Sequence, residues 1–146
     1  MFDELAPYYD AFLADKDYRR ESRRLEAIAR RYGRSRGRTW LDVGCGTGRH
    51  LVYLQHHRAV AGIDLSPAML RIARRRLPRV PLEVGDVRTF RLGRRFDVVS
   101  CLFGVLGHIE SERDLRRAFA RIAAHLAPGG SPSWSLGSTP RTTEPG

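Results

Sequence analysis

A glycine-rich turn that follows an acidic residue is the feature of this sequence best suited to chemistry. Residues 39–48 read Thr-Trp-Leu-Asp-Val-Gly-Cys-Gly-Thr-Gly, so Asp42 precedes glycines at three alternate positions. Glycines let a backbone bend sharply and approach a ligand where any Cβ would collide. The apolar residues before them suit a buried strand. We therefore expect a loop that binds a nucleotide-type ligand to begin near residue 42.

Two familiar phosphate-binding loops do not fit this turn. A dinucleotide-binding loop needs Gly-x-Gly-x-x-Gly. Counted from Gly44, the third glycine position holds Arg49, and counted from Gly46 it holds a leucine. A P-loop ends in Gly-Lys-Ser/Thr, but the only lysine of the chain is Lys16. The remaining pattern, Asp-x-Gly-x-Gly-x-Gly, places the Asp42 carboxylate where it would face a cationic ligand rather than a pyrophosphate.

Three aspartates repeat at the spacing of a strand-helix-strand unit. Asp42, Asp64 and Asp86 lie 22 residues apart. In a parallel sheet this spacing brings all three to the edge where open α/β sheets bind ligands. A single aspartate at a strand end is more often a turn former or helix cap than a ligand-binding residue. The expected position of all three at one edge favours ligand binding.

The segments after the glycine turn follow a recognisable order. Residues 58–64, 81–87 and 95–103 read as three further strands, and Ser66 with the following proline reads as the start of a helix. Together with residues 42–48, they resemble the successive motifs of class I S-adenosylmethionine-dependent methyltransferases. The resemblance implies S-adenosylmethionine as cofactor. It also implies cofactor contacts from Tyr18, Asp42, Gly44, Cys45, Gly46, Asp64, Leu65, Met69, Asp86, Val87 and Phe103, with Asp64 on the ribose and Asp86 on the adenine amino group.

The N-terminal segment narrows this resemblance. Residues 5–12 and 16–21 carry Tyr-Tyr-Asp and Lys-Asp-Tyr-Arg-Arg-Glu, which resemble elements of small-molecule methyltransferases. The closest likeness is to the amino-sugar N-methyltransferases of macrolide deoxysugar synthesis, and it covers roughly residues 2–130. It implies a small-molecule acceptor, an amine nitrogen of an amino sugar, with Tyr9 over the methyl group or that nitrogen and Tyr18 at the methionine end.

Methyl transfer to an amine needs alignment and the removal of one proton. The reaction is an in-line displacement, so positioning alone supplies several kcal/mol of the barrier. A histidine suits the role of general base at neutral pH, and His108 follows the fourth expected strand. His108 and Tyr9 are therefore the catalytic candidates. The alternatives are that His108 caps a helix beginning near Glu110 and that Tyr9 only packs.

Charge and composition leave a second class of function open. The chain of 146 residues carries a formal net charge of +10, and its arginine clusters could contact nucleic-acid phosphates. Those clusters nevertheless fit the solvated faces of amphipathic helices, without interleaved aromatic residues for base stacking. Nucleic-acid methylation and a non-catalytic cofactor- or partner-binding remnant stay as alternatives. The two cysteines read as free thiols and no metal site is expected. With no membrane-spanning or signal segment in the sequence, we expect a cytoplasmic protein.

The fold expected is a doubly wound α/β methyltransferase domain with strand order 3-2-1-4. Helices are predicted near 16–32, 47–56, 66–76 and 111–126. Residues 131–146 lack the apolar pattern of a fifth strand and read as a disordered tail. We therefore expect a domain over 1–130, comprising a helical segment to about residue 36 and a core from about 37, that lacks the last three strands. Its fourth strand would then be an exposed edge able to self-associate.

Overall fold

A single parallel sheet organises the chain. The computed structural model describes Ala6, Tyr8, Val105 and residues 16–34, 37–102 and 108–134. The strands are β1 (Thr39–Val43), β2 (Ala59–Asp64), β3 (Leu82–Val84), β4 (Phe96–Cys101) and β5 (Leu126–Trp134). They pair in the order β3-β2-β1-β4-β5, and every neighbouring pair is parallel. The predicted doubly wound α/β fold and its 3-2-1-4 order are confirmed.

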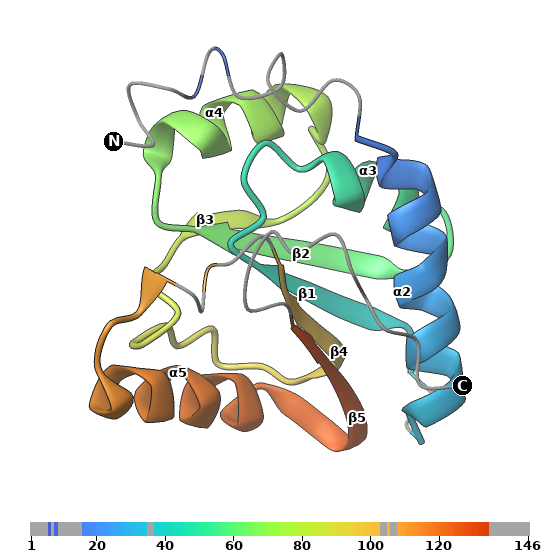
Figure 1. The fold of residues 1–146 in the computed structure, drawn as a ribbon. Coiled ribbons are helices and arrows are strands. Elements are labelled where there is room, and N and C mark those ends of the chain that lie inside the picture. The colour runs from blue at the N-terminus through green and yellow to red at the C-terminus, as the bar shows by residue number, and fades with distance from the viewer. Residues whose placement is uncertain are drawn as a thin grey trace.

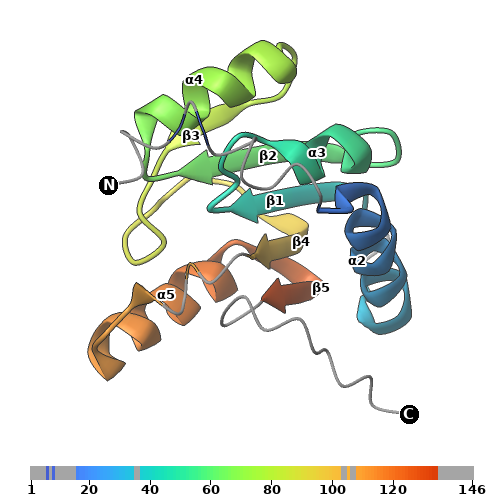
Figure 2. The ribbon, with the colours of Figure 1, turned by 45° about the horizontal axis from the view of Figure 1, so that its top comes forward.

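Helices cover both faces of this sheet. The described helices are α2 (Tyr18–Tyr32), α3 (Arg49–Leu54), α4 (Pro67–Arg76) and α5 (Glu112–Ala124), each ending within two residues of its predicted bounds. The first three pack on one face, where Trp40 of β1 is fully buried, and α5 packs on the other beneath Leu41 and Val43 (Figure 1 and Figure 2). Successive β1 residues thus enter different cores, because strand side chains alternate between faces.

Local sequence explains where the helices near the loop begin. At α4 the Ser66 side chain accepts a hydrogen bond from the Met69 amide at 3.2 Å, with Pro67 in the first turn, as predicted. At α5 the cap is Ser111, whose hydroxyl accepts from the Asp114 amide at 3.1 Å. The alternative in which His108 caps this helix is therefore wrong, since a hydroxyl one residue before the helix already satisfies that amide.

The edge of the sheet differs from the sequence prediction. β5 pairs with β4 from Phe96 opposite Leu126 to Cys101 opposite Trp134, with a register shift after the first pair. The expectation that β4 is an unpaired edge is wrong. Because β5 occupies that side of β4, the predicted self-association through β4 has no structural basis. An outermost strand bonds on only one side, so Pro132, which has no amide hydrogen, is tolerated there.

The expected boundary at residue 130 lies inside β5. Residues 135–146 of the predicted tail lie outside the described residues. No helix in the described part of the chain is both long and apolar enough to cross a membrane.

Candidate cofactor-binding pocket

A pocket of about 560 Å³ opens at the carboxyl-terminal edge of the sheet. Segments far apart in the sequence meet there: the β1 loop, the ends of β2 and β3, and the approach to α5. Of the residues predicted from the sequence, it is lined by Gly44, Gly46, Asp64, Leu65, Met69, Asp86, Val87 and His108. The prediction that these segments share one edge of a parallel sheet is confirmed.

The glycine loop forms one wall because its backbone turns back over β2. Gly44 and Gly46 have positive φ angles of 75° and 57°, a region open to glycine at little cost. The amides of Gly44 and Cys45 both donate to the Ile63 carbonyl, at 2.8 and 2.9 Å. A Cβ on Gly44 would lie 2.4 Å from Cγ2 of Val105, which also lines the pocket. The glycine therefore permits both the turn and the close approach of the segment after β4.

Asp64 is held at the end of β2 by backbone donors. Its Oδ2 accepts from the Gly46 amide at 2.8 Å, and its Oδ1 accepts from the Ser66 amide at 2.9 Å. These backbone donors orient Asp64 at the pocket wall, and a carboxylate is an acceptor-only group suited to ligand hydroxyls. Leu65 beside it is 65% exposed on the pocket wall, where an apolar ligand surface would cover it.

Asp42 lies deeper than the other two aspartates. It pairs in register with Gly62, two residues before Asp64, and it is 2% exposed and absent from the pocket wall. Ser100 on β4 donates to Asp42 Oδ1 at 2.9 Å, and the Trp40 indole donates to the Ser100 hydroxyl at 2.9 Å. Burial raises the pKa of Asp42 to about 6, although the charge of His50 and the Ser100 hydrogen bond lower it. This carboxylate therefore sits under the loop rather than facing the pocket.

Cys45 and Tyr18 also lie away from the pocket wall. Cys45 is 8% exposed in the core beneath β2, and a Cβ on Gly62 would lie 2.8 Å from its sulfur. Burial raises the pKa of the Cys45 thiol, which does not suit a nucleophile. Tyr18, 3% exposed at the start of α2, packs edge-on against His50 with Arg49 4.7 Å above its ring. Their cofactor contacts remain predictions.

Two predicted site residues, Tyr9 and Phe103, lie outside the described residues. His108 is exposed at the mouth of the pocket with Glu110 nearby on the lining. The pocket thus brings the general-base candidate to the same edge as Asp64, while the role of Tyr9 stays a prediction.

Sequence reasoning missed several polar residues around the site. Arg88, Ser111 and Asp114 line the pocket, and His50 is buried in α3 with its Nε2 2.8 Å from Oε2 of Glu21. The Asp-x-Arg spacing of Asp86 and Arg88 is a weak local signal of a turn that folds the arginine back. Nothing in the sequence pairs Asp114 or His50 with its partner, because those contacts span 26 and 29 residues.

The pocket is acidic in a basic chain. Among the residues that the structure describes, its lining holds the carboxylates Asp64, Asp86, Glu110 and Asp114 and one arginine, Arg88, although the chain as a whole carries +10. A cavity with this balance favours a cationic ligand over a phosphate. In the part of the chain that the structure describes, no group of three or more His, Cys, Asp or Glu side chains is arranged to bind a metal ion.

Comparison with known proteins identifies the family. Residues 41–130 match the methyltransferase domain family, and this chain belongs to that family. Over 130 residues it is 45% identical to a dTDP-3-amino-3,6-dideoxy-alpha-D-glucopyranose N,N-dimethyltransferase of Streptomyces fradiae, covering 87% of this chain and 51% of that protein.

Solved structures give the same class. The fold is similar to that of DesVI of Streptomyces venezuelae, with a TM-score of 0.86 and 38% identity, over 94% of this chain and 59% of that one. It is also similar to SAM-bound CalS10, an amino pentose methyltransferase of Micromonospora echinaspora, with a TM-score of 0.79 and 41% identity, over 88% and 56% of the two chains. The chain thus spans a little over half the length of each of these three relatives.

Proposed function

We propose that this chain binds S-adenosylmethionine and that the protein transfers its methyl group to an amine nitrogen of a nucleotide-linked amino sugar. The observation that carries the proposal is the convergence of Asp64 and Asp86 on one acidic pocket walled by a glycine loop. The similarity to a dTDP-amino-sugar N,N-dimethyltransferase and to SAM-bound CalS10 supports the same cofactor and acceptor class.

The residues present fit this cofactor. Asp64 is oriented to accept ribose hydroxyls, and Leu65, Met69 and Val87 supply apolar surface for a base. The acidic lining suits the positive sulfonium. When bound, S-adenosylmethionine supplies an activated methyl group that an amine attacks in line.

The chain's own residues have two roles in the reaction, alignment of the reactants and removal of a proton. The pocket walls align donor and acceptor, and His108 at the pocket mouth takes a proton from the amine before or during transfer. A test of this role is His108→Gln, which should lower kcat with little change in KM for the cofactor. An unchanged kcat and pH–rate profile would remove His108 from the mechanism.

Calorimetric titration with S-adenosylmethionine and S-adenosylhomocysteine tests the binding half of the proposal. We expect saturable binding that Asp64→Asn weakens and Asp97→Asn does not. Asp97 is the matched control, because it also accepts from a backbone amide, that of Thr39 at 2.9 Å, but lies at the opposite end of the sheet. Lack of binding by the folded wild-type chain would contradict the proposal.

Turnover is tested with dTDP-linked 3-amino and 4-amino sugars, with transfer of a labelled methyl group as the readout. Nucleic acid is the competing acceptor. A basic pocket of about 490 Å³ lined by Arg30, Arg38 and Arg58 lies at the amino-terminal end of the strands, away from the acidic pocket. Methylation of an oligonucleotide with no transfer to amino sugars would replace the proposed acceptor class.

A further inference from the structure

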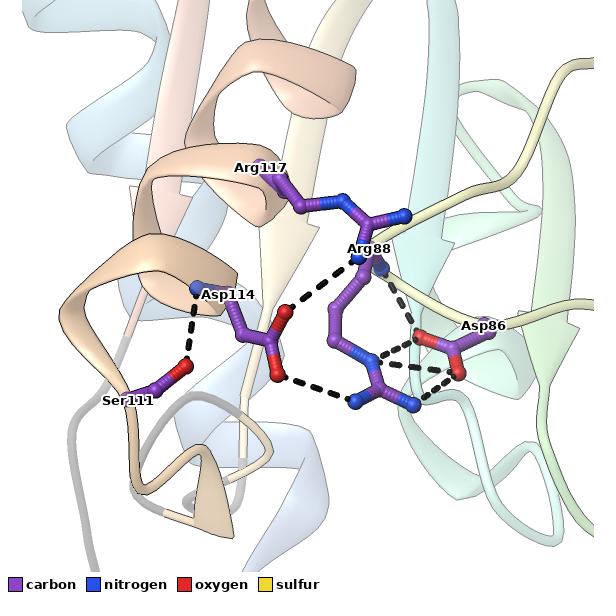
Figure 3. A network of polar contacts seen from close by, with 5 residues as sticks. All are labelled: Asp86, Arg88, Ser111, Asp114 and Arg117. Carbon is purple, nitrogen blue, oxygen red and sulfur yellow. Dashed lines mark hydrogen bonds and ion pairs between the residues drawn. The ribbon is translucent and has the colours of Figure 1, made fainter.

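Arg88 lies between two carboxylates at the β3–α5 end of the pocket (Figure 3). Its Nη2 is 2.7 Å from Oδ2 of Asp86 and its Nε is 3.0 Å from Oδ1. Its Nη1 is 3.2 Å from Oδ2 of Asp114. One guanidinium therefore bridges the segment after β3 and the first turn of α5, since its planar fork can bind two carboxylates at once.

The backbone prepares this contact on both sides. The Arg88 amide donates to Asp86 Oδ1 at 2.9 Å, which forms a tight turn and folds the arginine side chain back over the carboxylate. On the other side, Ser111 caps α5 by accepting from the Asp114 amide, and Arg117 adds a 3.3 Å contact to Asp114 Oδ1. Both carboxylates are thus oriented on the pocket wall by several hydrogen bonds each.

The hydrogen bonds leave Asp86 one main position for a ligand. Oδ1 accepts from the amide of Arg88 at 2.9 Å and from its Nε at 3.0 Å, and Oδ2 accepts from Nη2 at 2.7 Å. Nε carries one hydrogen, and its contact with Oδ2 is longer, at 3.3 Å. Because each carboxylate oxygen has two lone pairs, the lone pair of Oδ2 that meets only this longer contact can accept from a donor in the pocket. The hydrogen bonds of Arg88 also lower the pKa of Asp86, which keeps it an acceptor at neutral pH.

We propose that Arg88 is a positioning residue that makes Asp86 select a purine carrying a 6-amino group over one carrying a 6-oxo group. The proposal rests on the proposed function, in which the adenine lies against Asp86. An ionised, clamped carboxylate accepts from an amino group but meets an oxo group with like partial charge. A carboxylate released from Arg88 can rotate away from the purine, which removes both the acceptor for the amino group and the like charge beside the oxo group.

The experiment compares two ligands that differ in the 6-substituent of the purine and in the N1 proton that accompanies the 6-oxo form. S-adenosylhomocysteine and its deaminated analogue, S-inosylhomocysteine, are titrated calorimetrically into wild type, Arg88→Gln, Arg88→Lys and Arg116→Gln. Arg116 is the matched control, since it forms a 2.7 Å ion pair with Glu112 on the same helix, but with both side chains over three-quarters exposed. The readout is the ratio of the two dissociation constants, which a partly unfolded sample does not change.

Wild type should prefer the adenosyl ligand by roughly ten- to hundredfold, the range expected for a hydrogen bond to a charged group. Arg88→Gln should reduce this ratio at least fivefold, Arg88→Lys should give an intermediate ratio because a lysine keeps the charge without the fork, and Arg116→Gln should match wild type. A ratio unchanged in Arg88→Gln would overturn the positioning role, including the case in which both affinities fall equally. No saturable binding of S-adenosylhomocysteine by wild type would instead overturn the proposed function, and this inference with it.

Discussion

The two ends of the acidic pocket are built in different ways. At the β1–β2 end, backbone amides of Gly46 and Ser66 hold Asp64, and all of these residues lie in or beside a strand end. At the β3–α5 end, the Arg88 side chain holds Asp86 and reaches Asp114, 26 residues away in sequence. The first end is therefore fixed by the path of the chain, while the second depends on side chains that can move and exchange partners.

This difference predicts how each end responds to change. Substitutions at the β1–β2 end should disturb both folding and binding, because the hydrogen-bond donors to Asp64 are backbone amides of the folded core. Substitutions at the β3–α5 end should alter ligand preference with little loss of stability, since Arg88 is about two-fifths exposed.

The largest effect is expected at the glycine loop. Gly44→Ala places a Cβ 2.4 Å from Val105 Cγ2 on a backbone with φ of +75°, which combines left-handed strain with overpacking and should reduce stability by about 2–5 kcal/mol. Chemical denaturation measures the loss. Gly93→Ala is the control, because Gly93 has φ of +69° and open space around it, so it isolates the strain. Equal losses in the two variants would show that close approach to Val105 is unimportant.

The next effect is a pH dependence of stability from Asp42. Its pKa in the folded state is raised from 3.8 to about 6, so its stabilising contribution is fully present below about pH 4 and is lost as the pH rises through 6. Asp42→Asn keeps an acceptor for Ser100 without the buried charge. It should be more stable than wild type at pH 8, by up to about 3 kcal/mol, and nearly equal to it at pH 4.

Urea denaturation at both pH values measures this difference. Glu112→Gln, which removes a carboxylate that is 78% exposed, should follow the wild-type pH dependence. A wild-type stability that rises between pH 5 and 8 relative to Asp42→Asn would contradict a destabilising buried charge at this position.

A smaller effect is expected from Asp64→Asn, which also lowers stability, because an asparagine has one acceptor oxygen for the two backbone amides of Gly46 and Ser66. The side chain keeps its shape but loses charge and acceptor strength, so the affinity for S-adenosylhomocysteine should fall roughly tenfold to hundredfold. The decrease should be the same for S-inosylhomocysteine, because Asp64 lies at the end of the pocket away from the base. A decrease in affinity for only one of the two ligands would contradict the view that the two ends of the pocket act on different parts of the ligand.

The smallest effect is expected from Asp114→Asn. Arg88 keeps its paired contact with Asp86 in this variant, and a partly exposed ion pair contributes little, so adenosyl affinity should change less than threefold in calorimetry. A change as large as that of Arg88→Gln would show that the bridge to α5, rather than the pairing with Asp86, positions the carboxylate.

The equal spacing of three aspartates in the sequence correctly predicts the edge of the sheet at which they lie, but not how deeply each is buried. Asp42, Asp64 and Asp86 all lie toward the carboxyl-terminal edge, as predicted. Asp42 is buried nonetheless, because its register partner is Gly62 and the loop covers it. Register is a property of paired strands, so the spacing of one residue type cannot supply it.

The fifth strand shows the reverse limit. Its prolines, serines and glycines argue against a central strand, and on that ground residues 131–134 are predicted as tail. These residues instead form part of β5, because they pair with β4. An outermost strand needs backbone hydrogen bonds on one side only, and β4 provides them. Tertiary pairing overrides a weak intrinsic propensity here.

The sequence by itself determined the α/β order, the strands up to β4, the helix bounds and the glycine turn, because hydrophobic periodicity, caps and glycine conformations act over a few residues. It also determined the family, through motifs each contained in one loop. Only the tertiary structure decided that Asp42 is buried against Ser100, that β5 closes the edge beside β4, and that Arg88 joins Asp86 to Asp114. Those outcomes depend on which distant segments the folded core brings within hydrogen-bonding distance.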